Sequence, residues 1–206
     1  MNYSIRLIKS TCYTPTYWSG GMASELITYP DGSSFADRNF LWRIGCAKID
    51  VDTSTFSSLP DIKRHLMVTD GEMTLSHQDR YSKLLKPFNQ DFFMGDWTTT
   101  TKGRCSVLNL MTRGNYDGIL THINIMNETT SHLKFTHPEN SILIAVCIYP
   151  LNGNVKIHID NNHFDINKCD LLYIDIRNFN LFPGVELRSS KPDNVDLVSC
   201  AIFKYK

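Results

Sequence analysis

The sequence has no excess of charge of either sign. Its 206 residues include 21 lysines and arginines and 21 aspartates and glutamates, so the formal net charge at pH 7 is zero. There is no basic stripe and no run of like charges, which means that the electrostatic footprint of a nucleic-acid-binding protein is missing. This absence argues against DNA or RNA as a partner.

Long hydrophobic runs and closely paired cysteines are also missing. No apolar stretch approaches the ~20 residues that a membrane span needs, and the first residues do not resemble a signal peptide. The cysteines are widely scattered, which is typical of reduced thiols in cytosolic proteins, although their even number leaves disulfides formally open. We therefore expect a cytoplasmic protein without a membrane partner. The six cysteines are Cys12, Cys46, Cys105, Cys147, Cys169 and Cys200.

Motifs of common catalytic and cofactor sites are absent as well. There is no Gly-x-Ser-x-Gly elbow, and Gly20-Gly21 lacks the spacing of phosphate-binding loops. The seven histidines are scattered, and only His158 and His163, which flank one turn, suggest a metal pair. We therefore expect neither a metal nor another cofactor.

Strand-like patterns dominate the sequence, and no segment shows a long helical period. Residues 40–49 alternate between apolar and polar positions, and Ile142–Tyr149 is a near-continuous apolar run, typical of a central strand buried on both faces. Asp70-Gly71 is a strong hairpin signal, because glycine adopts the positive φ that a two-residue turn requires. These patterns predict an all-β protein with a hairpin at Asp70-Gly71.

The chain also repeats itself. The segment that begins at Gly71 resembles the segment that begins at Gly153, and Asp91–Asp96 resembles Asp170–Asp175 at nearly the same distance downstream. Two similar β-units in one chain indicate a duplicated barrel. We place the first barrel in residues 1–115 and the second in residues 116–206.

A group of polar residues near predicted strand ends is the candidate binding site. Arg43, Arg64 and Arg113 each lie near a strand end or on an outer face, and a guanidinium binds a carboxylate through two parallel hydrogen bonds. The alternative for any one of them is a solvated surface arginine. The remaining members of this group are Asn109, Ser57 and Trp42.

Short motifs in the first half resemble the HutD/Ves family. They occur in the family's order and near its spacing between about Trp18 and Arg113. Relative to the family pattern, Ser19 replaces an asparagine, Ala23 a threonine and Val107 an aspartate. The motifs are Phe40-x-Trp42-Arg43-Ile44, Phe56-Ser57-x-x-Pro60-x-x-x-Arg64, Gly71, Phe92-x-x-x-Asp96, Asn109-x-Met111-x-Arg113 and the glycine-rich segment Trp18 to Glu25.

The resemblance implies a bicupin, which consists of two antiparallel β-barrels of the double-stranded β-helix or RmlC-like jelly-roll type, with a pocket in the first. Family members are associated with histidine utilisation. They are proposed to bind an intermediate such as formylglutamate or urocanate and to act as regulators, with no established reaction. Both proposed ligands are carboxylates, which agrees with an arginine-containing pocket.

Together these observations lead us to expect a non-catalytic protein that binds a small anionic metabolite, without a metal, in the mouth of the first barrel. Arg64 is the expected main partner of the carboxylate, with Arg113 and Arg43 as second partners. Ser57 and Asn109 would orient the ligand, and Trp42 would form an apolar wall. Glu25 completes the expected set.

Two other functions and a possible homodimer stay open. The first is a cupin-type isomerase or hydrolase that acts on a small sugar or acid, with Glu25 or Asp96 as the base. The second is a β-sheet interaction module with no polar pocket, which an exposed apolar patch would favour.

Overall fold

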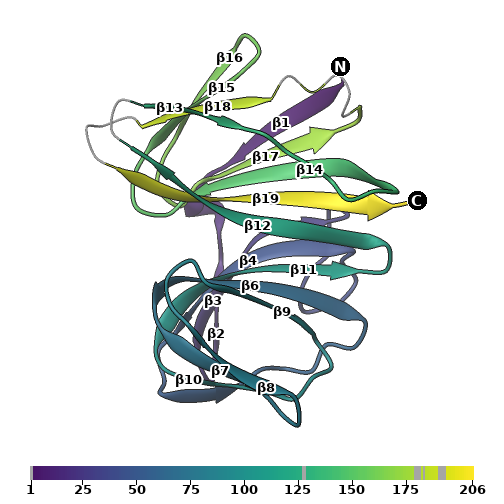
Figure 1. Cartoon of the computed structure of the whole chain (residues 1–206), viewed down its shortest axis with the longest axis vertical. Coiled ribbons are helices and arrows are strands. Elements are labelled where there is room, and N and C mark those ends of the chain that lie inside the picture. The colour runs from purple at the N-terminus through teal and green to yellow at the C-terminus, as the bar shows by residue number, and fades with distance from the viewer. Residues whose placement is uncertain (1, 127–128, 179–181, 183, 190–193) are drawn as a thin grey trace. The chain divides into compact units, whose positions relative to one another are not determined.

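Strands form nearly all the regular structure of the computed structural model, which describes every residue except 1, 127–128, 179–181, 183 and 190–193 (Figure 1). Within the described residues the only helical element is a short 3-10 helix, Ser10–Cys12. The prediction of an all-β protein is therefore confirmed. The chain divides into a central unit, residues 13–117, and a terminal unit, residues 1–12 and 118–206.

The central unit contains a six-stranded and a four-stranded antiparallel sheet (Figure 1). The order in the larger sheet is β2-β3-β4-β11-β6-β9, and in the smaller sheet it is β5-β10-β7-β8. The strands of the larger sheet are β2 (Pro15–Trp18), β3 (Gly21–Tyr29), β4 (Trp42–Ile49), β6 (Ile62–Gly71), β9 (Gln90–Met94) and β11 (Cys105–Arg113). Those of the smaller sheet are β5 (Thr53–Thr55), β7 (Met73–His77), β8 (Tyr81–Leu85) and β10 (Thr99–Lys102).

The terminal unit repeats this arrangement. Its strand orders are β1-β17-β14-β19-β12 and β13-β18-β15-β16, so β12-β19-β14-β17 corresponds to β4-β11-β6-β9 of the central unit. The internal repeat seen in the sequence is thus a repeat of topology. The strands are β1 (Tyr3–Ile8), β12 (Tyr116–Ile125), β13 (Thr130–Leu133), β14 (Ser141–Pro150), β15 (Val155–Ile159), β16 (Asn162–Ile166), β17 (Leu171–Ile176), β18 (Val185–Ser189) and β19 (Val195–Tyr205).

The N-terminal strand joins the second half of the chain, which differs from the expected domain limits. β1 pairs with β17 in antiparallel register, with Tyr3 opposite Ile176 and Ile8 opposite Leu171. The carboxylate of Asp170 reinforces this pairing by accepting hydrogen bonds from the Ser10 amide (2.8 Å) and the Lys9 ammonium (3.0 Å). Residues 1–12, which we expected in the first barrel, therefore belong to the terminal unit.

The predicted hairpin at Asp70-Gly71 is wrong. β6 ends at Gly71 in the six-stranded sheet, whereas β7 lies in the four-stranded sheet between β10 and β8. Gly71 has a φ of 71°, and a Cβ there would lie 2.6 Å from the Arg104 carbonyl oxygen. Glycine is needed because the chain bends from one sheet to the other at this point. The turn flanked by His158 and His163, by contrast, does join two paired strands, β15 and β16.

The two units differ in how polar their interiors are. Buried residues of the terminal unit form one apolar cluster that includes Val146, Ile157 and Leu197. The central unit also has an apolar cluster, around Leu66 and Val107. Among the buried residues that the structure describes, however, the arginines and the histidine all lie in the central unit; they are Arg43, Arg64 and His77.

Candidate functional site

Two neighbouring rows of side chains across the six-stranded sheet contain most of the predicted site residues. Residues paired across antiparallel strands share a face, and residues two apart along a strand lie on that same face. Both rows therefore lie on the face that carries Leu66 and Val107 of the apolar cluster. The first row is Arg43, Met111, Arg64 and Phe93, and the second is Glu25, Gly45, Asn109, Leu66 and Asp91.

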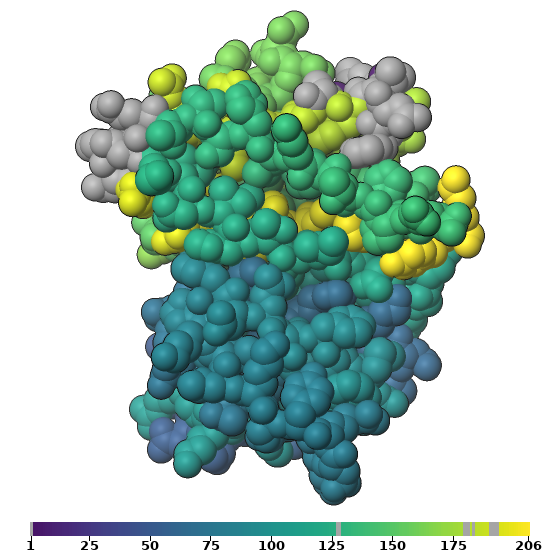
Figure 2. Space-filling view, in the orientation of Figure 1, coloured from purple at the N-terminus to yellow at the C-terminus, as the bar shows by residue number. Residues whose placement is uncertain are grey.

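Arg64 is a buried cation without an acidic partner. Its residue exposure is 6%, and it makes no hydrogen bond or ion pair with any residue in the described part of the chain. Its guanidinium carbon lies 4.5 Å from the ring centre of Phe56 and 5.0 Å from that of Phe93. Figure 2 shows one face of this unit, with its side chains coloured from blue to teal. The two rings hold the guanidinium through cation–π contacts but do not neutralise it.

The electrostatics of Arg64 follow from this burial. Loss of hydration, and then the charge of Arg43, lower the pKa of Arg64 to about 9, so the guanidinium is still charged at neutral pH. A buried charge is costly unless an opposite charge and hydrogen bonds compensate it. An anion that bound here would supply both.

Arg43, in contrast, has a carboxylate partner. Its Nε donates to Glu25 Oε2 at 2.9 Å, and the same oxygen accepts a 2.9 Å hydrogen bond from the Phe35 amide. Burial lowers the pKa of Arg43, and the hydrogen bond and charge of Glu25 oppose that shift. A Cβ at Gly45 would lie 2.6 Å from the guanidinium, so glycine allows Arg43 to lie flat over the β4 backbone. The charges of Arg43 and Glu25 thus cancel each other.

The two rows, from Arg43 to Phe93 and from Glu25 to Asp91, together form a buried polar layer. Asn109 adds a second uncompensated group to this layer. The residue is 6% exposed, and its buried Oδ1 has no hydrogen-bond donor in the described structure. It lies one strand away from Arg64 and two residues along, a diagonal relation that puts Cα atoms about 7–8 Å apart. The layer therefore contains one unpaired cation and, beside it, one unpaired acceptor.

The structure places the other predicted residues outside this layer. Trp42 lies on the opposite face of β4 from Arg43 and stacks on Tyr29, with ring centres 5.5 Å apart, so it cannot be a wall beside Arg64. Ser57 is exposed on the loop before β6. Arg113 is half-buried and donates to the Arg38 carbonyl oxygen at 2.8 Å, which makes it a contact to the loop before β4.

The aromatic side chains that contact Arg64 were not among the predicted site residues. Phe56 and Phe93 replace Trp42 as the apolar neighbours of the guanidinium. In the pair Phe92-Phe93 alternation alone does not show which ring faces inward; Phe93 is 1% exposed and Phe92 is 49% exposed. The order of strands across the sheet decides which ring meets Arg64, and no local pattern encodes that order.

A buried histidine network lies next to these rings. His77 Nε2 is 2.9 Å from Asp91 Oδ2, its Nδ1 is 2.8 Å from Thr99 Oγ1, and its ring centre is 4.7 Å from that of Phe93. Tyr81 and Lys83 also contact the Asp91 carboxylate. Asp91 is thus occupied by these partners and does not serve as the counter-ion of Arg64. Sequence reasoning, which treated His77 as one scattered histidine, missed this network.

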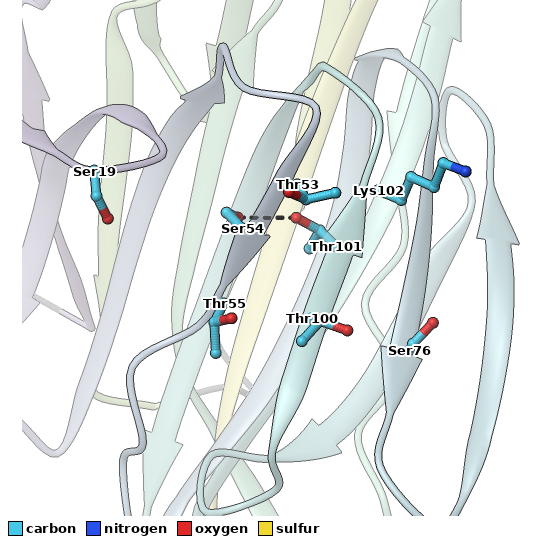
Figure 3. Close-up of a pocket in the computed structure, with 8 residues that line it drawn as sticks. All are labelled: Ser19, Thr53, Ser54, Thr55, Ser76, Thr100, Thr101 and Lys102. Atoms are coloured by element: carbon cyan, nitrogen blue, oxygen red, sulfur yellow. Dashed lines mark hydrogen bonds between the residues drawn. The ribbon is translucent and has the colours of Figure 1, made fainter.

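A hollow of about 610 Å³ lies elsewhere in the central unit, beside β5, β10 and β7 (Figure 3). Hydroxyl groups line nearly all of it, and Ser54 and Thr101 within it are joined by a 2.9 Å hydrogen bond. None of the predicted site residues lines this hollow. It offers hydrogen bonds to a polar molecule but no buried charge. The lining residues are Ser19, Thr53, Ser54, Thr55, Ser76, Thr100, Thr101 and Lys102.

The residues that the structure describes contain no group of three or more His, Cys, Asp or Glu side chains arranged to hold a metal ion. His158 and His163 face each other across the β15–β16 hairpin with ring centres 4.2 Å apart, and Glu186 Oε1 is 3.8 Å from His158 Nδ1.

In the described part of the chain, no helix is both long enough and apolar enough to cross a membrane.

Comparison with solved structures shows the fold. A conserved protein of unknown function from Pseudomonas aeruginosa PAO1 is 17% identical, with a TM-score of 0.80 over 97% of this chain and 98% of that one. HutD from Pseudomonas fluorescens SBW25, in a formate condition, is 18% identical, with a TM-score of 0.71 over 96% and 98% of the two chains. Oxalate decarboxylase from Lactobacillus farciminis, in a formate complex, is 8% identical, with a TM-score of 0.68 over 97% and 86%.

The family follows from the sequence as a whole. A model of the HutD family matches residues 10–189, which is most of the chain and includes strands of both units. The strand order and the structural neighbours agree with this match. The chain therefore belongs to the HutD family and has a cupin-like fold.

Proposed function

We propose that this protein binds a small anionic metabolite, a carboxylate, at Arg64 in the interior of the central unit, and that it does so without catalysis and without a metal. In this proposal each unit is a cupin barrel, so the whole chain is a bicupin. The observation that carries the proposal is that Arg64 is buried, charged and unpaired within the described structure.

A carboxylate is the class of ligand that this arrangement favours. Carboxylate oxygens accept two parallel hydrogen bonds from a guanidinium, and the bond is stronger where water is excluded. The rings of Phe56 and Phe93 fix the guanidinium before the ligand arrives, which reduces the entropy lost on binding. Family membership brings intermediates of histidine degradation, such as formylglutamate or urocanate, as candidates.

The positions of the carboxylates favour binding over catalysis. Glu25, the first candidate base, already accepts hydrogen bonds from Arg43 and from the Phe35 amide through one oxygen. Asp96, the second candidate, is exposed on the surface. A general base must be within hydrogen-bond reach of the proton that it removes, and neither residue presents an unoccupied carboxylate beside Arg64. These contacts support binding rather than catalysis, and the regulatory role in this proposal comes from the family resemblance alone.

The experiment is a thermal-shift titration with small carboxylates on the wild type and on Arg64→Met. A ligand at about 100 times its Kd should raise the Tm of the wild type by roughly 5–10 °C. Arg64→Met should abolish this shift, because the guanidinium is the only charge that the ligand neutralises.

Arg104→Met is the matched control, since Arg104 is an exposed arginine paired with Asp52. It should keep the full ligand-induced shift. An equal shift in Arg64→Met and in the wild type would show that the anion binds elsewhere, and the proposal would then be abandoned.

A further inference from the structure

We infer that the Arg64 site selects a monocarboxylate that also carries an N–H or O–H donor, and that it discriminates against dicarboxylates. This inference rests on the proposed function and specifies its ligand class. Of the two candidates named there, urocanate is a monocarboxylate with an imidazole N–H and fits the inference, whereas formylglutamate is a dicarboxylate and does not. It comes from counting the charges and the hydrogen-bonding groups that the layer leaves unpaired.

The charges give the first half of the inference. Arg43 and Glu25 neutralise each other at 2.9 Å, and Asp91 is occupied by His77, Tyr81 and Lys83. Arg64 is then left with one positive charge that no described side chain balances. A monoanion makes this layer neutral. A dianion would leave one negative charge buried without a counter-ion, and such a charge is strongly unfavourable in a protein interior.

The amide of Asn109 gives the second half. Its Oδ1 is buried and lacks a donor, and an unpaired buried acceptor favours any ligand that donates to it. Asn109 is the diagonal neighbour of Arg64 on the same face, so one small molecule can contact both groups. A ligand with a carboxylate at one end and an N–H or O–H group at the other satisfies both at once.

Succinamate, succinate and butyrate make a matched set of probes for isothermal titration at pH 7. They have nearly the same length and differ at one end, which is an amide, a second carboxylate or a methyl group. We expect succinamate to bind at least about tenfold more tightly than succinate, because one uncompensated buried group costs about a factor of ten or more. Butyrate should bind more weakly than succinamate.

Two variants of Asn109 separate the charge from the hydrogen bond. In Asn109→Leu the advantage of succinamate over butyrate should disappear, because the acceptor is gone. Asn109→Asp adds a carboxylate beside Arg64, so it should raise the Tm of the unliganded protein by a few degrees and weaken the binding of every probe at least tenfold. Arg104→Met should bind all three probes as the wild type does.

The outcomes distinguish this inference from the proposed function. If succinate binds as tightly as succinamate or more tightly, and Arg64→Met abolishes binding, the selection for a monoanion is overturned while anion binding at Arg64 stands. If none of the probes binds and Asn109→Asp leaves the Tm unchanged, both are overturned. Equal affinity for succinamate and butyrate in the wild type would overturn the assignment of Asn109 alone.

Discussion

At the scale of single residues, the buried charge of Arg64 destabilises the unliganded protein. Folding removes its guanidinium from water and supplies two aromatic rings, but no carboxylate from the residues that the structure describes. Cation–π contacts contribute only about 0.5–2 kcal/mol each, which is less than the cost of burying an unpaired charge. Such local costs are typical of binding sites, because the compensating group arrives with the ligand.

One prediction follows from this cost. Arg64→Met replaces the buried charge with an apolar chain of similar length, so we expect the unliganded variant to be more stable than the wild type by about 1–3 kcal/mol. For a chain of this size the Tm should rise by roughly 2–12 °C. Calorimetry without ligand checks it, and a fall in Tm would show that Arg64 is already compensated in the folded protein.

The lowered pKa of Arg64 predicts how anion binding depends on pH. The pKa of Arg64 is about 9, well below that of an arginine in the unfolded chain, so the folded protein loses this proton first as the pH rises. Binding of a carboxylate should therefore weaken as the pH increases from about 8 to 10. At pH values between the folded and the unfolded pKa of Arg64, the unfolded chain holds more protons than the folded protein. Titration of Arg64 by itself therefore makes the free energy of unfolding rise with pH. Affinity that stays constant up to pH 10.5 would contradict the prediction.

Of the three arginines that the sequence selected, the structure places Arg43 and Arg64 in one buried row, and no sequence pattern showed which side chains would be their neighbours. Arg43 and Arg64 could be selected because a guanidinium near a strand end suggests anion binding. Trp42 was included with them although period-2 alternation already puts it on the face opposite Arg43. The contact between Arg64 and Phe93 depends on the β6–β9 pairing, which joins residues far apart in the sequence.

At the scale of strands, alternation and apolar runs identified most elements but not their sheets. The turn signal at Asp70-Gly71 correctly marked a sharp bend, yet it could not show whether the next strand folds back on β6 or crosses to the other sheet. Burial favours the crossing to the other sheet, because Met73 and Leu75 of β7 are buried there, beside β10. The β15–β16 turn carried a similar signal and did form a hairpin.

The attachment of β1 can be tested at Asp170. Burial by itself would raise the pKa of Asp170, but hydrogen bonds from the Ser10 amide and from Lys9 lower it below its usual value. Because the folded pKa is depressed, this stabilisation is present above about pH 4 and is lost as the pH falls through the folded pKa. Asp170→Asn should cost about 1–3 kcal/mol at pH 7 and progressively less below pH 4.

The control for Asp170 is Asp165→Asn, a change of an exposed carboxylate on β16. It should leave the free energy of unfolding, measured in urea, within about 0.5 kcal/mol of that of the wild type. If Asp170→Asn behaves like this control at pH 7, the carboxylate does not hold the N-terminal strand in place.

At the scale of the whole molecule, one topology is used twice with different interiors. The two units share the order of four strands in the larger sheet and the order of the smaller sheet, so the duplication was predictable from the repeated sequence pattern. Only the central unit contains buried arginines and a buried histidine among the described residues. Duplication thus supplies two similar scaffolds, and the polar layer distinguishes the one that carries the candidate site.

The cysteines give a prediction for the whole chain, since all six are free and only Cys12 is exposed. Burial, together with the charge of Asp70, raises the pKa of Cys105 to about 11. Burial also raises the pKa values of Cys147 and Cys200, so these thiols are poor nucleophiles. A thiol-reactive dye should label Cys12 rapidly in the native protein, the half-buried Cys46 and Cys169 more slowly, and all six cysteines after unfolding. Cys12→Ser should remove the most rapid phase; rapid labelling of Cys105, Cys147 or Cys200 would contradict this packing.

The most direct test of the account is a crystal structure of the protein with a small carboxylate bound, butyrate for example. We predict two carboxylate oxygens about 2.7–2.9 Å from guanidinium nitrogens of Arg64. The guanidinium should keep its contacts with the rings of Phe56 and Phe93. A carboxylate bound in the hydroxyl-lined hollow beside β5 and β10, with Arg64 unoccupied, would contradict it.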